Sequence, residues 1–441
     1  MTPAAPLDTG DTAWLLVSAA LVLLMTPGLA FFYGGMVRAK SVLNMLMMSL
    51  ASIGVVSLLW VMFGFSVAFG SGSGRWSGLW GGLGSLGMSG LTAQATVNGA
   101  AYPVPVLAFA AFQLMFAVIT PALVSGAIAD RARFGAWMAF VALWVSLCYF
   151  PVAHWVFDFG DAHGNGAGWL ARLGVLDFAG GTAVHVNAGA AGLALALVLG
   201  RRIGWRREPM RPHNVPLVML GAGLLWFGWF GFNAGSALVA GQTAALAFVN
   251  TQLATAAAVL GWMLVERLRD GHCTSLGAAS GAVSGLVAIT PACAFVSPMG
   301  ACALGLAAGG VCALAVSLKW RLGFDDSLDV VGVHLVGGAF GSVALGFVAL
   351  NGGMLYGGGA ALLGKQVLAV LVVGGFSFTV AFVLGKVLDV LVGFRIPAHH
   401  EVRGIDLVAH RETGYDLVPV PEAEMGSVVP FSLADPATLD A

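Results

Sequence analysis

Long apolar stretches separated by short polar connections run through nearly the whole chain. A membrane-spanning helix needs about 20 mainly apolar residues. Eleven segments fit this pattern, at about 12–37, 42–70, 103–129, 134–155, 179–200, 214–234, 240–266, 275–291, 298–319, 332–351 and 362–392. The pattern predicts an all-α integral membrane protein with eleven transmembrane helices. An odd number of spans places the two ends of the chain on opposite sides of the membrane.

Positive charge is distributed unevenly over the predicted connections. The chain has 20 Lys and Arg residues, and all but Arg75, Arg172, Lys365 and Lys386 lie in alternate connections or in the C-terminal tail. Connections rich in Lys and Arg stay on the cytoplasmic side of a membrane. We therefore expect a multi-pass protein of the cell (inner) membrane. Residues 1–11 form an extracytoplasmic N-terminus, 12–394 the eleven-helix membrane domain and 395–441 a cytoplasmic tail.

The composition supports the same class of protein. Of the 441 residues, 59% are hydrophobic and 9% are charged, and the mean hydropathy is +0.90, which is too apolar for a soluble domain. The net charge of −1 argues against a nucleic-acid partner. The five cysteines show no CxxC spacing, so neither a zinc site nor a disulfide framework is expected. Residues 1–10 lack Lys and Arg, so the apolar run from Trp14 reads as a retained span rather than a signal peptide.

Two histidines lie inside predicted spans in matching contexts. His185 follows Asp177 by eight residues, and His334 follows Asp326 by eight residues. Ionisable groups at membrane depth are costly, so they face a cavity or each other. We expect a paired site along a conduction path; the alternative is two separate histidines that each satisfy an interhelical hydrogen bond. The fifth and tenth spans carry these histidines, so the two halves of the chain are offset by five spans. An odd offset inverts the direction of each span in the membrane, and we therefore expect an inverted five-helix pseudo-repeat.

Aromatic residues recur at helical spacing near the predicted outer ends of two spans. Phe112 and Phe116 are four residues apart, and Trp229, Phe232 and Ser236 are separated by three and four. Such residues share a helix face. Spacing alone favours ordinary core packing, but aromatic faces beside a hydroxyl at a pore entrance would bind a small cation.

The chain strongly resembles the ammonium transporter family (the Amt/Mep/Rh superfamily), in particular its bacterial Amt branch, from about Trp14 to about Tyr415. The stretches that carry the resemblance are Thr26–Gly35, Asp177–Thr182, Gly228–Ser236, Ala244–Thr251 and Gly332–His334. The resemblance implies the ammonium transporter fold and a homotrimer with a narrow hydrophobic pore in each protomer. It also implies ammonium or methylammonium as the substrate, with no cofactor, resident metal or catalytic residue.

The resemblance further implies roles for residues along that pore. Phe116 and Phe232 match the stacked phenylalanine gate. His185 and His334 match the paired pore histidines, and Trp229 matches the pore-lining tryptophan. Ammonium would lose its proton before the apolar segment, ammonia would pass, and net proton transfer is expected.

The outer recruitment site contains one departure from the family pattern. Phe116 and Ser236 match its phenylalanine and hydroxyl, whereas the usual tryptophan aligns with Phe157. A tryptophan, Trp155, lies two places earlier, so either residue could complete the site. Asp177 matches the nearby aspartate, which acts as a helix cap or in deprotonation.

The remaining polar groups are expected to be solvated. We expect His154 at the outer surface and Asp325, Asp326 and Asp329 in a cytoplasmic turn, and 201–211 could bind lipid headgroups. The tail from Arg395 resembles the family's C-terminal segment, which implies coupling between protomers and a PII-type signalling partner. Residues after Val418 are expected to be disordered.

Three other functions compete with transport. An ammonium sensor or transceptor with low flux would signal through the tail, and an Rh-like channel would pass ammonia or carbon dioxide passively. A membrane enzyme would need metal ligands such as His185, His334 and Asp177. No third ligand clusters with the histidines in the sequence, so an enzyme is disfavoured.

Overall fold

The computed structural model describes residues 7–70, 72, 74–91, 96–97, 102–160, 164 and 166–415. Over this part of the chain, ten helical spans are long and apolar enough to cross a membrane. They are Thr9–Met36, Ala39–Phe69, Val106–Ile128, Phe134–Phe157, Gly181–Leu199, Val215–Gly235, Gln242–Asp270, Pro298–Leu322, Val331–Val348 and Ala361–Val392. The remaining predicted span, at about 275–291, corresponds to α11 (Ser275–Ile289), a shorter helix of 15 residues. The fold is therefore the predicted all-α membrane bundle.

Several spans are built from more than one helix, and the labels follow the chain. The labels are α1 (Thr9–Met36), α2 (Val42–Leu59), α3 (Phe65–Phe69), α4 (Val106–Ser125), α5 (Phe134–Trp144), α6 (Phe150–Phe157), α8 (Asn187–Leu199), α9 (Val215–Gly235), α10 (Gln242–Asp270), α12 (Pro298–Ala315), α13 (Leu318–Leu322), α14 (Val336–Val348) and α15 (Ala361–Val392). Connections contain α7 (Trp169–Leu173) and the antiparallel strands β1 (Thr96–Val97) and β2 (Tyr102–Pro105). The tail contains α16 (Ala398–Arg403).

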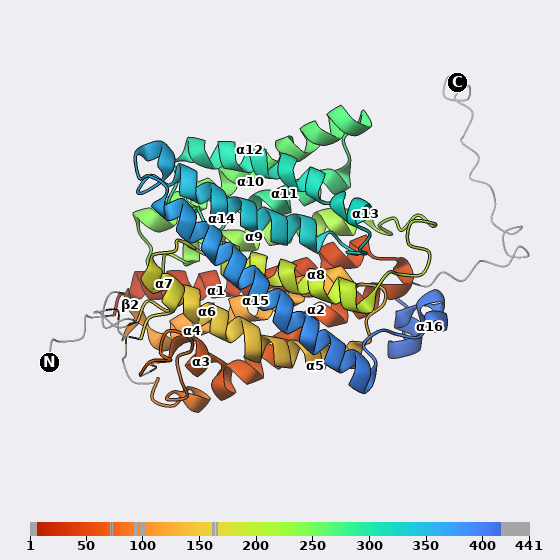
Figure 1. The fold of residues 1–441 in the computed structure, drawn as a ribbon, viewed down its shortest axis with the longest axis horizontal. Coiled ribbons are helices and arrows are strands. Elements are labelled where there is room, and N and C mark those ends of the chain that lie inside the picture. The colour runs from red at the N-terminus through yellow and green to blue at the C-terminus, as the bar shows by residue number, and fades with distance from the viewer. Residues whose placement is uncertain are drawn as a thin grey trace, which may run out of the picture.

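The long helices run between two ends of the bundle (Figure 1). We call one the Ser236 end, where β2, α7 and Ser236 lie, and the other the Arg202 end, where α13, α16 and Arg202 lie. Asp8 begins α1 at the Ser236 end, where its carboxylate accepts a hydrogen bond from Asp11 N at 2.8 Å. The tail ends at the Arg202 end, so the two ends of the described chain lie at opposite ends of the bundle (Figure 1).

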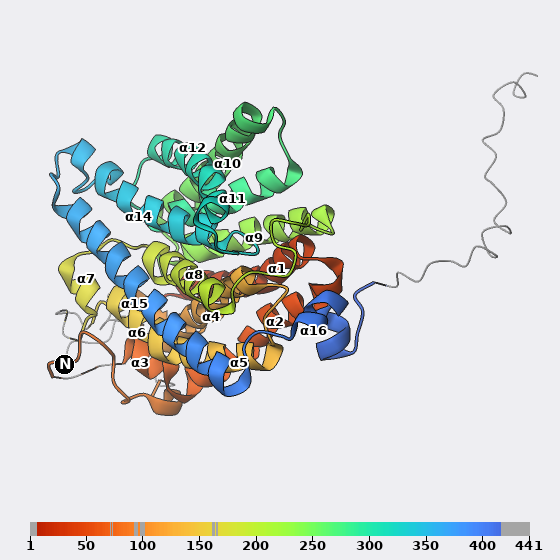
Figure 2. The same ribbon diagram turned by 45° about the vertical axis from the view of Figure 1, so that its right-hand side comes forward.

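Glycine allows α1 and α9 to pack closely along their length (Figure 2). A Cβ atom added at Gly221 would lie 2.3 Å from the backbone nitrogen of Phe32, and one at Gly28 would lie 3.0 Å from the Cβ of Leu224. Membrane helices associate through such close packing, because lipid supplies no hydrophobic force between them. At least these two of the chain's 63 glycines therefore serve close helix packing.

The two histidine-bearing spans begin with π-helical turns that continue into α-helices. Gly181–Val186 precedes α8 and contains His185, and Val331–Leu335 precedes α14 and contains His334. Asp177 lies at the Ser236 end, and Asp326 lies at the Arg202 end. The spans therefore enter the bundle from opposite ends, as the inverted repeat predicts.

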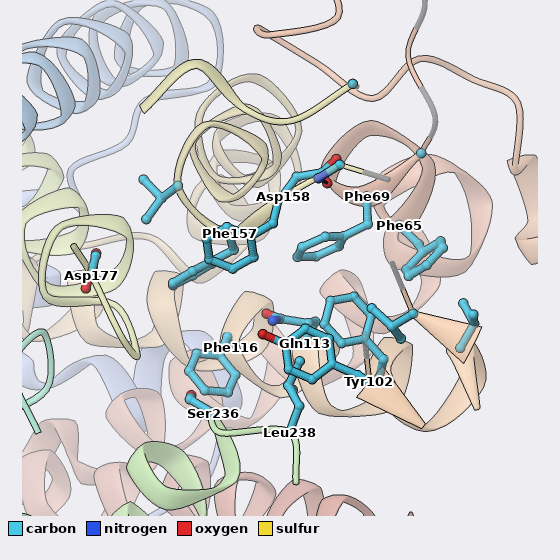
Figure 3. Close-up of a pocket in the computed structure, with 18 of the residues that line it drawn as sticks. Phe65, Phe69, Tyr102, Gln113, Phe116, Phe157, Asp158, Asp177, Ser236 and Leu238 are labelled. Atoms are coloured by element: carbon cyan, nitrogen blue, oxygen red, sulfur yellow. Dashed lines mark hydrogen bonds between the residues drawn. The ribbon is translucent and has the colours of Figure 1, made fainter. Parts of the chain in front are cut away.

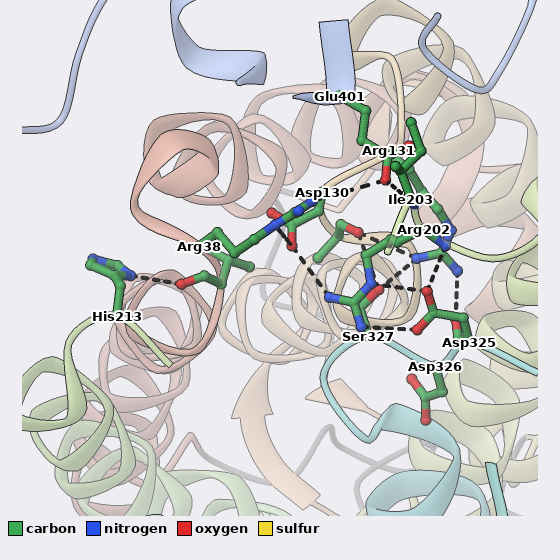
Figure 4. A network of polar contacts seen from close by, with 12 residues as sticks. Arg38, Asp130, Arg131, Arg202, Ile203, His213, Asp325, Asp326, Ser327 and Glu401 are labelled. Atoms are coloured by element: carbon green, nitrogen blue, oxygen red, sulfur yellow. Dashed lines mark hydrogen bonds and ion pairs between the residues drawn. The ribbon is translucent and has the colours of Figure 1, made fainter. Parts of the chain in front are cut away.

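The prediction of a solvated turn at Asp325 and Asp326 is wrong, because both carboxylates are buried at the Arg202 end. Arg202 is buried with them, and its guanidinium contacts both oxygens of Asp325 at 2.9 Å and Asp130 Oδ2 at 3.3 Å (Figure 4). Burial by itself raises the pKa of Asp325, but hydrogen bonding to Arg202 and the nearby guanidinium charges outweigh it and lower that pKa. Arg202 is thus held by protein groups rather than left for lipid headgroups.

The tail packs against this end of the bundle. Glu401 on α16 accepts a hydrogen bond from Ile203 N at 2.6 Å and pairs with Arg395 at 2.9 Å. Asp406 accepts hydrogen bonds from the backbone nitrogens of Leu43 and Asn44, at the first turn of α2. The described tail is therefore an ordered part of the fold up to residue 415, and the predicted disorder after Val418 lies outside the described residues.

Removing the Asp325 carboxylate should destabilise the protein strongly. Asp325→Ala would leave the buried Arg202 guanidinium with only Asp130 Oδ2 at 3.3 Å, an acceptor that it shares with Arg38. Removing one partner from a buried ion pair costs about 3–5 kcal/mol in proteins. Thermal unfolding of the detergent-solubilised protein should show a clearly lower midpoint. The control is Asp270→Ala, which breaks a solvent-exposed pair with Arg269 and should cost no more than about 1 kcal/mol. Equal midpoints for the two variants would contradict the structural importance of the buried pair.

Candidate conduction site

A cavity of about 640 Å³ opens at the Ser236 end of the bundle. Nine of its 25 lining residues are aromatic, and its walls come from α3, β2, α4, the end of α6, the loop that follows α9 and several other connections (Figure 3). Its lining includes Phe65, Phe69, Tyr102, Phe109, Gln113, Phe116, Phe157, Asp158, Asp177, Phe178, Ser236, Leu238 and Phe295. A cavity that combines several aromatic faces with polar side chains suits a small cation that has shed part of its water.

Two stacked rings lie at the inner boundary of this cavity. Phe116 on α4 and Phe232 on α9 have ring centroids 4.2 Å apart and an interplanar angle of 25°. Both side chains are buried, and Phe116 lines the cavity whereas Phe232 lies beyond it. The ring of Phe112, one helical turn before Phe116, packs edge-on against it at 4.9 Å. The predicted pair is therefore in contact, and its rings separate the cavity from the residues behind it.

Ser236 and Phe157 both reach the cavity beside this stack. The hydroxyl of Ser236 follows the last turn of α9 and donates a hydrogen bond to Phe232 O at 2.8 Å. Its oxygen keeps lone pairs that can accept from a guest. The ring of Phe157 lies edge-on to Phe116, with centroids 6.4 Å apart. Phe116, Phe157 and Ser236 are thus brought together at one place.

Trp155 points to a different part of the molecule. Its indole nitrogen donates a hydrogen bond to Leu79 O at 2.9 Å, and its ring packs against Phe376 of α15 at 4.8 Å and Trp169 of α7 at 6.0 Å. It is not among the cavity-lining residues. α6 remains regular through Phe157, so the two positions face different ways. Of the two alternatives, the structure places Phe157 on the cavity.

The two histidines meet behind the phenylalanine stack. The Nδ1 atoms of His185 and His334 are 3.3 Å apart, and their ring planes are inclined by 20°. The His185 ring lies 6.1 Å from that of Phe232. Both side chains are almost fully buried. The Nε2 atom of His185 has no hydrogen-bond partner among the described residues. It is therefore a polar atom that a guest molecule could bind in an otherwise apolar interior.

Neighbouring side chains fix the orientation of the pair. The indole of Trp229 stacks on the His185 ring with centroids 5.3 Å apart. Its Nε1 donates to Thr290 Oγ1 at 2.9 Å, and Thr290 also contacts Asn233 Oδ1 at 3.2 Å. The position predicted for Trp229 is thus beside the histidines, held by a buried hydrogen-bond chain from α9 to the end of α11.

Asp177 is a helix cap. Its carboxylate accepts hydrogen bonds from the backbone nitrogens of Gly180, Gly181, Thr182 and Ala183 at 2.6–3.0 Å, and from the hydroxyl of Thr182. These groups are the unpaired donors that start a helix. Burial raises the pKa of Asp177, and these hydrogen bonds counteract part of that shift. Of the two roles considered from the sequence, helix cap and proton acceptor, these contacts correspond to the helix cap.

The sequence did not single out several residues that line the cavity, and it misplaced one histidine. Gln113, Tyr102 and Asp158 add polar groups to the lining. Of these, Gln113 could have been found from the sequence, because it is a polar residue inside an apolar span. His154 was expected at the surface but is fully buried, with its ring nitrogens close to Ala68 O and Ser77 O. The apolar residues on both sides of His154 in the sequence could have indicated that it is buried.

A metal centre finds no support in the described part of the chain, where no three His, Cys, Asp or Glu side chains are grouped to hold an ion. The two histidines and Asp177 are not such a group, because Asp177 is occupied by the backbone of the following turn.

Comparison with known proteins gives the chain its family. The model of the Ammonium Transporter Family matches residues 13–415. An ammonium transporter of Mycobacterium tuberculosis is 54% identical, over 96% of this chain and 93% of the relative. An ammonium transporter of Bacillus subtilis is 45% identical, over 93% of this chain and 99% of the relative.

Solved structures show the same fold. Saccharomyces cerevisiae Mep2 superimposes with a TM-score of 0.82 and 34% identity, over 90% of this chain and 89% of that structure. A structure titled "Sensor Amt Protein" superimposes with a TM-score of 0.83 and 29% identity, over 91% of this chain and 98% of that structure. With a family model that matches nearly its whole length and relatives this similar, the chain belongs to the Ammonium Transporter Family.

Proposed function

We propose that this protein recruits ammonium in the cavity at the Ser236 end, removes its proton and conducts ammonia past His185 and His334. The observation that carries the proposal is the alignment of three groups: the aromatic cavity, the Phe116–Phe232 stack and the contacting histidines. Membership of an ammonium transporter family supplies the substrate class.

The cost of burying charge requires that the proton and the ammonia separate. Moving an ammonium-sized ion into a medium of low dielectric constant costs about 20 kcal/mol in the idealised limit. On insertion scales, a charged group at mid-membrane still costs at least ~2.5–3.5 kcal/mol. Neutral ammonia avoids most of this cost. A path closed by Phe116 and Phe232 would therefore reject sodium and potassium, which cannot give up their charge.

The recruitment site would hold the cation through Phe116, Phe157 and Ser236. Ring faces attract a cation through their quadrupoles, and the Ser236 oxygen accepts one N–H. Phe157 offers a weaker face than the indole that the family places there. Phe116 and Phe232 would then act as the gate, because the guest must displace the stack to reach the histidines.

The histidine pair would guide the neutral guest. In a neutral pair, one Nδ1 donates its hydrogen to the other across the 3.3 Å contact. The Nε2 atom of His185, which contacts no described hydrogen-bonding group, is then free to bond ammonia. Trp229, stacked on the His185 ring, would hold that ring in its orientation. Net transfer of one proton with each ammonia is the expected stoichiometry.

The orientation and assembly follow from charge and from the family. Because all the arginines except Arg75 and Arg172 lie at the Arg202 end, we place that end on the cytoplasmic side of the cell (inner) membrane. The Ser236 end then faces outside, with the N-terminus. A homotrimer and a PII-type signalling partner at the cytoplasmic face are further proposals. The tail that packs on α2 through Asp406 would transmit the partner's binding.

Methylammonium uptake tests the proposal. Single changes of His185 or His334 to Ala should each remove most of the uptake by cells that lack other ammonium transporters, and the double variant should lose little more, because both residues serve one contact. Wild-type protein with normal expression and no uptake would contradict transport and favour the sensor alternative. Independent losses that multiply in the double variant would contradict a shared site.

The aromatic residue of the outer site is tested by a reciprocal pair of variants. Phe157→Trp should lower the apparent KM for methylammonium severalfold, since cation–π contacts contribute ~0.5–2 kcal/mol and ~1.4 kcal/mol corresponds to tenfold. The maximal uptake rate should fall or stay level, because a cation that is bound more tightly leaves the recruitment site more slowly. Trp155→Phe is the control and should leave KM unchanged. The reverse result, with KM moved only by Trp155→Phe, would remove Phe157 from the site.

A further inference from the structure

His154 is buried behind the recruitment cavity and is surrounded by hydrogen-bond acceptors. Its Nδ1 atom lies 3.0 Å from Ala68 O and 3.1 Å from Asp158 Oδ2. Its Nε2 atom lies 2.7 Å from Ser77 O. Backbone carbonyls and an ionised carboxylate can only accept hydrogen bonds. Both ring nitrogens therefore face oxygen atoms that need a donor.

Only one state of the ring satisfies all these neighbours. A neutral imidazole carries a single N–H, so either tautomer would turn a nitrogen lone pair toward a carbonyl oxygen. An imidazolium carries a hydrogen on both nitrogens. A contact of 2.7 Å is also typical of a charge-assisted bond. The surroundings of His154 thus suit a buried cation, which needs a counter-charge in contact with it.

Asp158 supplies this counter-charge at the edge of the cavity. It lies one helical turn after His154 and directly after Phe157, and it lines the same cavity (Figure 3). Its Oδ1 accepts a hydrogen bond from Gly160 N at 2.8 Å, while Oδ2 faces the His154 ring. Among the described charges, the solvent-exposed Arg172 has its guanidinium beside Gly78, next to Ser77, and the capping carboxylate of Asp177 lines the same cavity.

A buried positive charge next to a cation site would weaken binding unless it is cancelled, because like charges placed close together are unfavourable. We propose that the His154–Asp158 ion pair sets the affinity of the recruitment site for cations, with Asp158 as a positioning residue that cancels the imidazolium charge. This inference rests on the proposed ammonium recruitment at Phe116, Phe157 and Ser236. It adds two residues to that site that act by charge rather than by contact.

Opposite responses to two neutralising changes test the pair. Asp158→Asn leaves the imidazolium uncompensated, so the KM for methylammonium should rise at least about fivefold with little change in maximal uptake. His154→Gln leaves the carboxylate uncompensated, so KM should fall. The double variant restores neutrality and should return KM to within about twofold of wild type. Asp8→Asn is the matched control: it removes a carboxylate from the same end but keeps a side chain that caps α1, and KM should stay unchanged.

A merely structural role predicts a different result, because damage to the wall would raise KM in both single variants and would not be rescued in the double variant. That result, or an unchanged KM in Asp158→Asn, would overturn the proposal. The ring itself is observed by ¹⁵N NMR of histidine-labelled full-length protein in lipid, with His154→Gln to assign the signal. Two protonated ring nitrogens are expected, and a neutral ring would overturn the proposal even if the variants fold poorly. Absence of wild-type uptake would instead contradict the proposed function and leave the NMR result to decide on the pair.

Discussion

The contact between His185 and His334 is the interaction on which the arrangement of the bundle depends. Two imidazoles can lie this deep only where the helices that carry them approach closely. Gly189 and Gly338 allow this approach: an added Cβ would lie 2.3 Å from Leu335 N at the first position and 2.9 Å from the Cβ of His185 at the second. The close packing of these two spans therefore brings the two imidazoles into contact.

The same constraint explains the polar groups that surround the pair. A helix that starts inside a bundle leaves backbone N–H groups without partners. Asp177 satisfies them before His185, and Asp326 accepts from Val330 N and Val331 N before His334. The caps lie at opposite ends, so each histidine is carried inward from its own end. At the Arg202 end, the buried Arg202 pairs with Asp325. In the described part of the chain, the interior between the two caps holds the two histidines among mostly apolar side chains.

Much of this could be predicted from the sequence, for physical reasons that differ by element. The long apolar stretches located the spans, because a helix needs about 20 mainly apolar residues to cross the membrane. The repeated Asp-to-His spacing predicted that His185 and His334 form one site, because a buried ionisable group needs a partner. The contact of Phe157 with Phe116, as opposed to Trp155, could not be predicted, since it depends on which way α6 faces at its last turn. The burial of Asp325 and His154 was missed for a related reason: their partners Arg202 and Ser77 are distant in sequence.

The central claim is that the pore passes a neutral molecule and excludes ions that keep their charge. Current recorded from proteoliposomes that contain the full-length protein tests it most directly, with ammonium and potassium pulses of equal concentration. The account predicts a transient current with ammonium, carried by the separated proton, and none with potassium above that of empty liposomes. A potassium current comparable to that of ammonium would contradict the exclusion of ions, and uptake of ammonium without any current would contradict net proton transfer.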